Sequence, residues 1–187
     1  MKIDKNSYGT IALSWLISAA LTLLILKTIG MNTVGYTISV LVLLFSVFVT
    51  WFHRVPVRHT PEGDRIVTSG ADGKVVIIKK VYEKEYLKRE CMQVSVYMDF
   101  FNVHANFWPV TGKVSYYKYH PGRYLLAFLP KAAEENEHSS TAINTGKEEI
   151  FFKQIAGTFA RRIVCYSQEG SEELRGVQCG IIKFGSR

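Results

Sequence analysis

The chain has 187 residues and carries 23 Lys and Arg against 16 Asp and Glu, a formal net charge of +7. This length allows one ordinary domain plus an appendage. Three cysteines without Cys-x-x-Cys spacing and five scattered histidines exclude a disulfide framework and predict no metal site. Nucleic acid is also excluded as a partner, because there is no basic helix, RNP-type motif or Lys/Arg run.

Two uncharged stretches open the chain. Asn6 to Leu26 and Thr28 to Phe52 contain no charged residue over 21 and 25 residues. Each is long enough to cross the ~30 Å hydrocarbon core of a bilayer as a helix, and Gly30 and Asn32 indicate a tight turn between them. Residues 1–52 are therefore predicted to be a membrane anchor of two transmembrane helices. Two buried helices of a soluble domain are the alternative.

Basic residues lie outside both stretches and predict the orientation of this anchor. Lys2 and Lys5 precede the first stretch, and Arg54 and Arg58 follow the second. Because Lys and Arg concentrate on the cytoplasmic side, both ends of the hairpin should be cytoplasmic. We therefore expect the protein in the inner membrane with its remaining domain on the cytoplasmic side, where a basic domain is attracted to anionic lipid.

Residues 53–187 are predicted to form one compact β-rich domain, so the fold class is mainly β (α+β) behind a helical hairpin. A charged connector covers 53–68. A polar segment over 131–146 is expected to be a mobile loop, either a lid over a substrate or a solvated connector. The predicted strands are 74–81 (mostly buried), 93–98, 112–119, 123–129, 150–155, 163–166 and an alternating strand within 176–187.

The end of the last strand carries a possible site of self-cleavage. Gly185 has no side chain to shield its carbonyl and tolerates strained dihedral angles, so the hydroxyl of Ser186 can fold back onto that carbonyl. Attack would convert the amide into an ester. Gly-Ser is also an ordinary turn pair, and by itself this dipeptide does not distinguish the two interpretations.

Three further sites upstream have both a functional and a structural interpretation. His104 lies among apolar and aromatic residues that could hold its imidazole neutral as a general base, although it could equally be a satisfied core residue. Asp72 belongs to an Asp-Gly turn before a strand and could be only a turn former. Arg161 and Arg162 could meet a phosphate, or point apart into solvent.

The order of four motifs distinguishes these interpretations. The chain resembles the short, membrane-anchored proenzyme form of phosphatidylserine decarboxylase over about 61–187. The motifs are Ser-Gly-Ala-Asp-Gly at 69–73, Phe-Asn-Val-His-Ala-Asn-x-x-Pro-Val-x-Gly at 101–112, Gln-Ile-Ala-Gly-x-x-Ala-Arg-Arg-Ile-Val at 154–164 and Gly-Ile-Ile-Lys-Phe-Gly-Ser-Arg at 180–187.

The resemblance implies a self-cleaving triad in which His104 deprotonates Ser186 and Asp72 orients the imidazole. Cleavage would separate a large subunit, 1–185, from a small subunit that pairs with it and begins at Ser186. That serine becomes a covalent pyruvoyl group, the only cofactor implied, which forms a Schiff base with the serine amine of phosphatidylserine in the membrane. Loss of carbon dioxide then gives phosphatidylethanolamine.

The chain departs from the family pattern in three places. Gly70 stands in the first motif where a proline is frequent. His138 stands where an arginine is usual, which weakens a substrate contact assigned to an arginine there; His138, Arg161 and Arg162 are the expected substrate-binding residues. Family members also continue beyond the serine, whereas only Ser186 and Arg187 remain here. Two alternative functions stay open: decarboxylation of an ether-linked seryl phospholipid, and a non-catalytic, membrane-tethered lipid-binding module.

Overall fold

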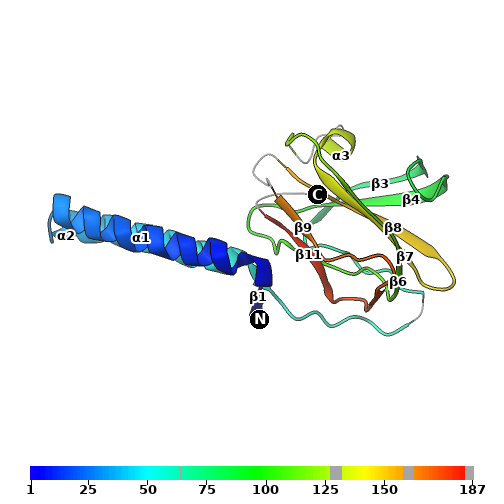
Figure 1. Ribbon diagram of the computed structural model, residues 1–187, viewed down its shortest axis with the longest axis horizontal. Helices are drawn as coiled ribbons and strands as arrows, with labels where there is room; N and C mark the ends of the chain where they lie inside the picture. The colour runs from blue at the N-terminus through cyan, green and yellow to red at the C-terminus, as the bar shows by residue number, and fades with distance from the viewer. Residues whose placement is uncertain (64, 127–131, 158–161, 184–187) are drawn as a thin grey trace. The chain divides into compact units, whose positions relative to one another are not determined.

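The computed structural model describes residues 1–63, 65–126, 132–157 and 162–183. The chain divides into two compact units, Met1–Pro56 and Val57–Arg187. The first is mainly helical and the second is built of antiparallel strands (Figure 1). A membrane anchor in 1–52 and a catalytic domain in 53–187 remain predictions about what these units do.

The first unit is a helical hairpin, as the sequence predicts. Helices α1 (Tyr8–Thr28) and α2 (Thr33–Phe52) lie side by side along their length (Figure 1). Gly30 makes the turn at φ 94°, which favours glycine, and the Asn32 side chain accepts a hydrogen bond from Gly35 N at 3.0 Å. Both helices are long and apolar enough to cross a membrane.

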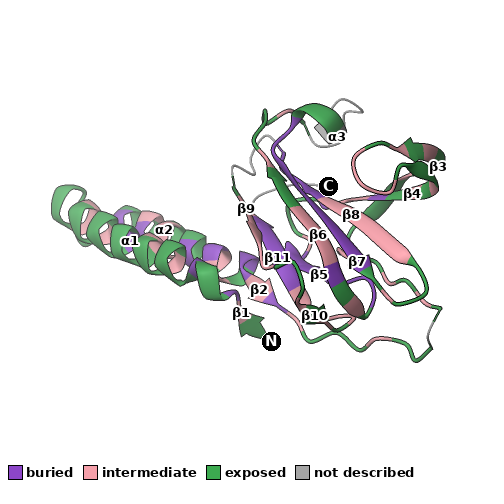
Figure 2. Ribbon diagram, turned by 45° about the vertical axis from the view of Figure 1, so that its right-hand side comes forward, coloured by how far each residue is buried: buried purple, intermediate pink, exposed green. Residues whose placement is uncertain are grey.

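Small polar side chains join the two helices. Ser18 Oγ lies 2.7 Å from Ser46 Oγ, and Ser46 Oγ donates to Ser14 O at 3.0 Å. Trp15 Nε1 donates to Thr50 Oγ1 at 3.1 Å. Most helical residues are exposed (Figure 2), and many of the exposed ones are large and apolar. Since lipid offers no hydrogen-bond partners, polar contacts between the helices are the ones expected on such a hairpin.

A short sheet closes the open end of the hairpin, which the sequence did not predict. Strand β1 (Lys2–Ile3) pairs with β2 (Arg54–Val55), and a 3-10 helix, η1 (Lys5–Ser7), precedes α1. Asp4 N donates to His53 O at 3.0 Å, while the Asp4 carboxylate accepts from Ser7 Oγ at 3.0 Å.

The described residues of the second unit form three antiparallel sheets. A four-stranded sheet has the order β10-β6-β7-β8, a three-stranded sheet β5-β11-β9, and β3 and β4 form a separate two-stranded ribbon. The bounds are β3 Lys74–Glu83, β4 Arg89–Tyr97, β5 Ala105–Phe107, β6 Gly112–His120, β7 His138–Asn144, β8 Glu149–Ile155, β9 Arg162–Cys165, β10 Glu172–Glu173 and β11 Gln178–Lys183, with a short helix α3 at Ala132–Glu135.

The core of this unit lies between the two larger sheets. Trp108 packs its ring edge-on against Phe152, with 5.7 Å between centroids. The strands β5, β7 and β11 are the most buried (Figure 2). The core cluster around Trp108 consists of the buried residues Trp108, Val110, Val114, Ile143 and Cys179.

The structure corrects three expectations about this unit. The segment 131–146 is not a loop: within its described part, β7 is a central, buried strand whose serines and threonine are hydrogen-bonded. Residues 123–126 form no strand and make one isolated bridge, Arg123 to Asn136, while 127–129 lie outside the described residues. Strand β3 is largely exposed, because the two-stranded ribbon leaves one face uncovered.

Candidate functional site

The four motifs meet in one place, although they are far apart in the sequence. Phe107 N donates to Gly70 O at 2.8 Å, which joins the first motif to the second. Ile182 N donates to His104 O at 3.1 Å and joins the second to the last. Gln154 Nε2 donates to Asn106 Oδ1 at 2.8 Å, which brings in the third. A site assembled from all four motifs is therefore possible.

Strand β11 carries the last motif and brings it next to His104. It pairs antiparallel with β5, so that Ile181 lies opposite Ala105, and with β9, so that Lys183 lies opposite Arg162. Gly185, Ser186 and Arg161 lie outside the described residues. The described chain nevertheless continues to Lys183, one residue after Ile182, which bonds to His104 O, and two residues before Gly185.

His104 is fully buried at the entry to β5. Its Nδ1 lies 3.0 Å from Asn102 O. A carbonyl oxygen can only accept, so the neutral ring carries its proton on Nδ1 and leaves the lone pair on Nε2. The main chain therefore sets the tautomer that a general base needs.

Asp72 lies in the turn that precedes β3. Its carboxylate forms an ion pair with Arg58, and both side chains are about one-third exposed. Gly73 follows at φ 153°, where a Cβ atom would come within 2.1 Å of Tyr97 O, so the turn requires glycine. Ala71 packs against the buried cluster of Met98, Ala156 and Ile182. Ala71, which precedes Asp72, and Ile182, which bonds to His104 O, therefore pack in the same cluster. That Asp72 orients the His104 imidazole stays a prediction.

Arg162 and His138, two of the residues expected to bind the substrate, lie in different surroundings. Arg162 is exposed at the start of β9, opposite Lys183. His138 is buried at the start of β7, where Nδ1 lies 2.7 Å from Asn136 O and the ring stacks on His120 with 4.4 Å between centroids. Burial lowers the pKa of His138, because the charged ring would lose solvation. Its contact with a substrate stays a prediction.

A network centred on Glu85 was not apparent from the sequence. His120 Nε2 lies 2.6 Å from Glu85 Oε1, and Lys153 Nζ lies 2.7 Å from Oε2. Ser140 Oγ donates to Oε2 at 3.0 Å. Burial alone would raise the pKa of Glu85, but the hydrogen bonds from Lys153 and His120 outweigh it and lower the pKa to about 2. The network fixes the tip of the β3–β4 ribbon to the four-stranded sheet.

Two residues of this network, with His138, form the one cluster in the described part of the chain whose side chains could together bind a metal ion. The ligand atoms of Glu85, His120 and His138 lie within 4.8 Å of one another. The two imidazole planes are nearly parallel, 13° apart, so their lone pairs do not converge on one point. Lys153 already neutralises the carboxylate. In this structure Glu85 is held by Lys153, His120 and Ser140, and the absence of a metal ion stays a prediction.

We expect Glu85→Gln to lower the free energy of unfolding by about 2 to 3 kcal/mol at neutral pH. The folded pKa of Glu85 lies below its ordinary 4.5, so its contribution is complete above about pH 4.5 and is lost as the pH falls toward 2. Near-ultraviolet circular dichroism of the whole chain in detergent would follow unfolding at each pH.

Glu148→Gln is the matched control, because Glu148 is 70% exposed in its 3.7 Å ion pair with Arg89. We expect it to change stability by less than about 1 kcal/mol. A difference between the natural chain and Glu85→Gln that stays constant from pH 7 to the acid limit would show that the Glu85 charge does not stabilise the fold.

A line of buried polar side chains connects the third motif to the second, and the sequence did not indicate it. Ser139 Oγ donates to Gln154 Oε1 at 2.9 Å, and Gln154 donates in turn to Asn106. All three residues are at most 5% exposed. Because buried polar groups are costly unless paired, this line fixes β7, β8 and β5 relative to one another.

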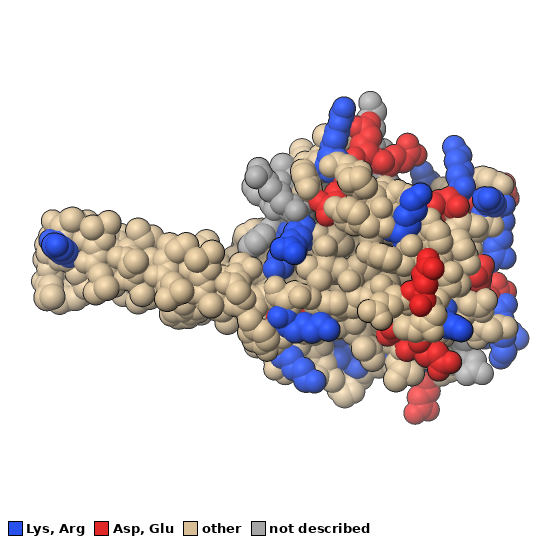
Figure 3. Space-filling model, viewed as in Figure 1, with Lys and Arg blue, Asp and Glu red and all other residues tan. Residues whose placement is uncertain are grey.

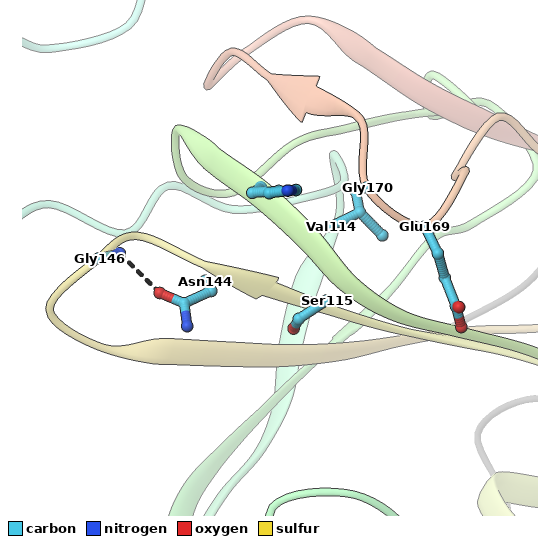
Figure 4. A pocket seen from close by; sticks show the side chains of 7 residues that line it. Val114, Ser115, Asn144, Gly146, Glu169 and Gly170 are labelled. Carbon is cyan, nitrogen blue, oxygen red and sulfur yellow. Dashed lines mark hydrogen bonds between the residues drawn. The ribbon is translucent and has the colours of Figure 1, made fainter.

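A shallow hollow of about 500 Å³ lies elsewhere in the unit (Figure 4). Asn144 accepts a hydrogen bond there from Gly146 N at 2.6 Å. None of its lining residues belongs to the four motifs, so it is not the candidate site. They are Lys113, Val114, Ser115, Asn144, Gly146, Glu169 and Gly170.

Comparison with known proteins agrees with the motifs. A family model described as phosphatidylserine decarboxylase matches residues 45–187. A phosphatidylserine decarboxylase proenzyme of Syntrophus aciditrophicus is 47% identical over 151 residues, covering 80% of this chain and 71% of the relative. Proenzymes of the same name from Amoebophilus asiaticus and Porphyromonas gingivalis are 39% and 38% identical over all of this chain and 84% and 86% of their own lengths. The chain belongs to the phosphatidylserine decarboxylase family.

Proposed function

We propose that this chain is the precursor of an enzyme that cleaves itself at Gly185-Ser186 and then converts phosphatidylserine to phosphatidylethanolamine. The observation that supports it most is that the other three motifs all hydrogen-bond to the second motif, at His104, Asn106 and Phe107. Membership of the family supports the decarboxylase activity. Self-cleavage and the residues that perform it are the finer part of the proposal.

His104 is proposed as the base for cleavage. Its Nε2 lone pair would take the proton of the Ser186 hydroxyl as the oxygen attacks the Gly185 carbonyl carbon. The peptide C–N bond then breaks and the proton passes to the leaving amine, which gives an ester. Elimination across the serine Cα–Cβ bond separates the two fragments, and hydrolysis of the resulting dehydroalanine releases ammonia and leaves a pyruvoyl group.

The surroundings of His104 fit a site that forms a pyruvoyl group by self-cleavage. The base is buried, its tautomer is set by Asn102 O, and its own carbonyl holds Ile182 in β11, four residues before Ser186. When formed, the pyruvoyl group supplies a carbonyl that accepts the electrons left behind when the serine carboxylate departs as carbon dioxide.

Basic residues near the site are suited to the phosphate of the lipid. Arg162 is exposed and lies opposite Lys183 at the ends of β9 and β11. A guanidinium can bind a phosphate through two parallel hydrogen bonds. We propose that Arg162, with Arg161, binds the phosphodiester of the substrate.

The two helices support a membrane location for this chemistry. They are long and apolar enough to span it, and the basic residues on their flanks favour an inner membrane location with the second unit on the cytoplasmic side. The substrate is then available in the same bilayer.

Activity can be tested on the chain extended by the residues that follow the matching segment in a longer relative. We expect the extended protein to release carbon dioxide from phosphatidylserine vesicles and to form phosphatidylethanolamine, and Ser186→Ala to do neither. Parallel assays with ester-linked and ether-linked seryl lipids would separate those two substrates. Lipid binding without carbon dioxide release would favour a non-catalytic module instead.

A further inference from the structure

A turn just before His104 presents two phenylalanines to solvent. Phe100 and Phe101 follow β4 and are 42% and 69% exposed. Their rings contact each other edge-on, with 5.8 Å between centroids at 89°. Two neighbouring aromatic rings are unfavourable in water when exposed. Phe100 and Phe101 therefore indicate a surface that contacts apolar material.

The exposure results from a well-ordered turn. The Asp99 carboxylate accepts hydrogen bonds from Phe101 N at 2.9 Å and Asn102 N at 3.1 Å. In return, the Asn102 side chain accepts from Asp99 N at 2.9 Å. These bonds fix the backbone on both sides of the two rings, so the chain holds the rings outward.

This turn is directly connected to the candidate base. Asn102, which closes the turn, also provides the carbonyl oxygen 3.0 Å from His104 Nδ1. Any surface on which Phe100 and Phe101 rest therefore lies at a fixed distance from the imidazole. The turn is in a position to set how deep the site sits relative to that surface.

The charges around the turn favour an anionic surface. Lys183 lies one residue beyond Ile182, whose N–H bonds to His104 O, and Arg162 lies opposite Lys183. Lys74 pairs with Tyr97 at the base of the turn. The one acidic residue of the turn, Asp99, uses its carboxylate within the turn. Figure 3 shows Lys and Arg dispersed over the second unit, while the helices carry almost no charge along their length.

We propose that Phe100 and Phe101 insert into the interface of a bilayer that contains anionic phospholipid, and so hold the site at head-group depth. Aromatic rings favour the interface, and nearby basic residues add attraction to anionic lipid. The inference rests on the proposed function for its purpose, because a pyruvoyl group that reacts with a lipid head group must lie at the membrane surface.

Insertion can be measured without any enzymatic activity. The full chain is reconstituted in nanodiscs with Phe101→Cys carrying an environment-sensitive fluorophore, in a background where Cys91, Cys165 and Cys179 are alanine and thermal unfolding is unchanged. We expect a blue-shifted emission and quenching by brominated lipid, both stronger when phosphatidylserine is included. Leu174→Cys, at a site 64% exposed, is the control and should stay in water.

Emission at position 101 that matches the Leu174 control would overturn the proposal. A blue shift in nanodiscs that brominated lipid does not quench would also overturn it, because a second protein copy rather than lipid would then cover the rings.

Kinetics of the cleaved, extended protein provide a second readout. For Phe100→Ser with Phe101→Ser, we expect the apparent KM for phosphatidylserine in vesicles to rise about tenfold with kcat unchanged. Activity on a short-chain, monomeric phosphatidylserine should be unaffected. Equal losses on both substrates would mean that the rings only support His104, and the proposal would be wrong. Failure of the natural sequence on both substrates would instead reject the proposed function and leave the fluorescence result standing.

Discussion

His104→Ala should slow self-cleavage by about 10³-fold in the chain extended beyond Arg187, so that the protein accumulates as one uncleaved chain. The reason is that the substitution removes the imidazole proposed as the base, while the main chain of His104 stays bonded to Ile182 in β11. The backbone bonds of His104 remain. Gel electrophoresis over time after synthesis measures the cleaved fraction.

Two controls separate loss of the base from loss of the fold. His59→Ala removes an exposed histidine of the connector and should leave cleavage unchanged. Added imidazole should restore part of the cleavage in His104→Ala, because the truncated side chain leaves a space for it. Cleavage of His104→Ala at the natural rate would remove His104 from the mechanism.

Asp72→Asn should slow cleavage by about 10² to 10⁴-fold, by analogy with a serine protease triad, in which the aspartate charge stabilises the imidazolium that forms when the histidine takes the proton. Asparagine keeps the size of the side chain and its ability to form the turn before Gly73, but it loses the charge. A time course of cleavage is again the measurement.

The ion pair with Arg58 offers a competing explanation for Asp72, and a second variant distinguishes the two. Arg58 also lies over the ring of Phe107, 5.3 Å from its centroid, so the pair could serve only to hold the connector. We expect Arg58→Met to slow cleavage by less than about tenfold. If Arg58→Met and Asp72→Asn are equally slow, the role of Asp72 is to hold Arg58.

The helical hairpin could be predicted because its signals are local. The absence of charge over two long stretches and the Gly30 and Asn32 turn both depend on neighbouring residues alone. The structure contains the two helices with that turn. The small β1–β2 sheet depends on contact between residues some 50 positions apart, and no local pattern indicates it.

Strand β7 shows why the polar residues of 131–146 wrongly predicted a loop. Ser139, Ser140 and Thr141 look like loop residues, yet each has a partner from another element: Gln154, Glu85 and Ser167. Buried hydroxyls are tolerated when paired, and the pairing becomes visible only once the sheet is formed. The opposite error affected β3, whose Val and Ile residues predict burial but lie in a two-stranded ribbon with an exposed face.

For the site, the motifs indicated which residues to examine but not how they are connected. His104 and Asp72 were identified by their motifs, whereas the bond from Asn102 O, the ion pair with Arg58 and the Glu85 network follow from the three-dimensional arrangement. Glu85 and His120 are 35 positions apart, which is why metal-type or ion-pair spacing could not be recognised in the sequence.

The most direct test of the account is the mass spectrum of the extended protein after purification. We expect one large fragment that ends at Gly185 and one small fragment whose first residue is a pyruvoyl group in place of Ser186. Borohydride should reduce that group and abolish carbon dioxide release at the same time. A protein that decarboxylates phosphatidylserine while its chain remains intact, or equally well as Ser186→Ala, would contradict the account.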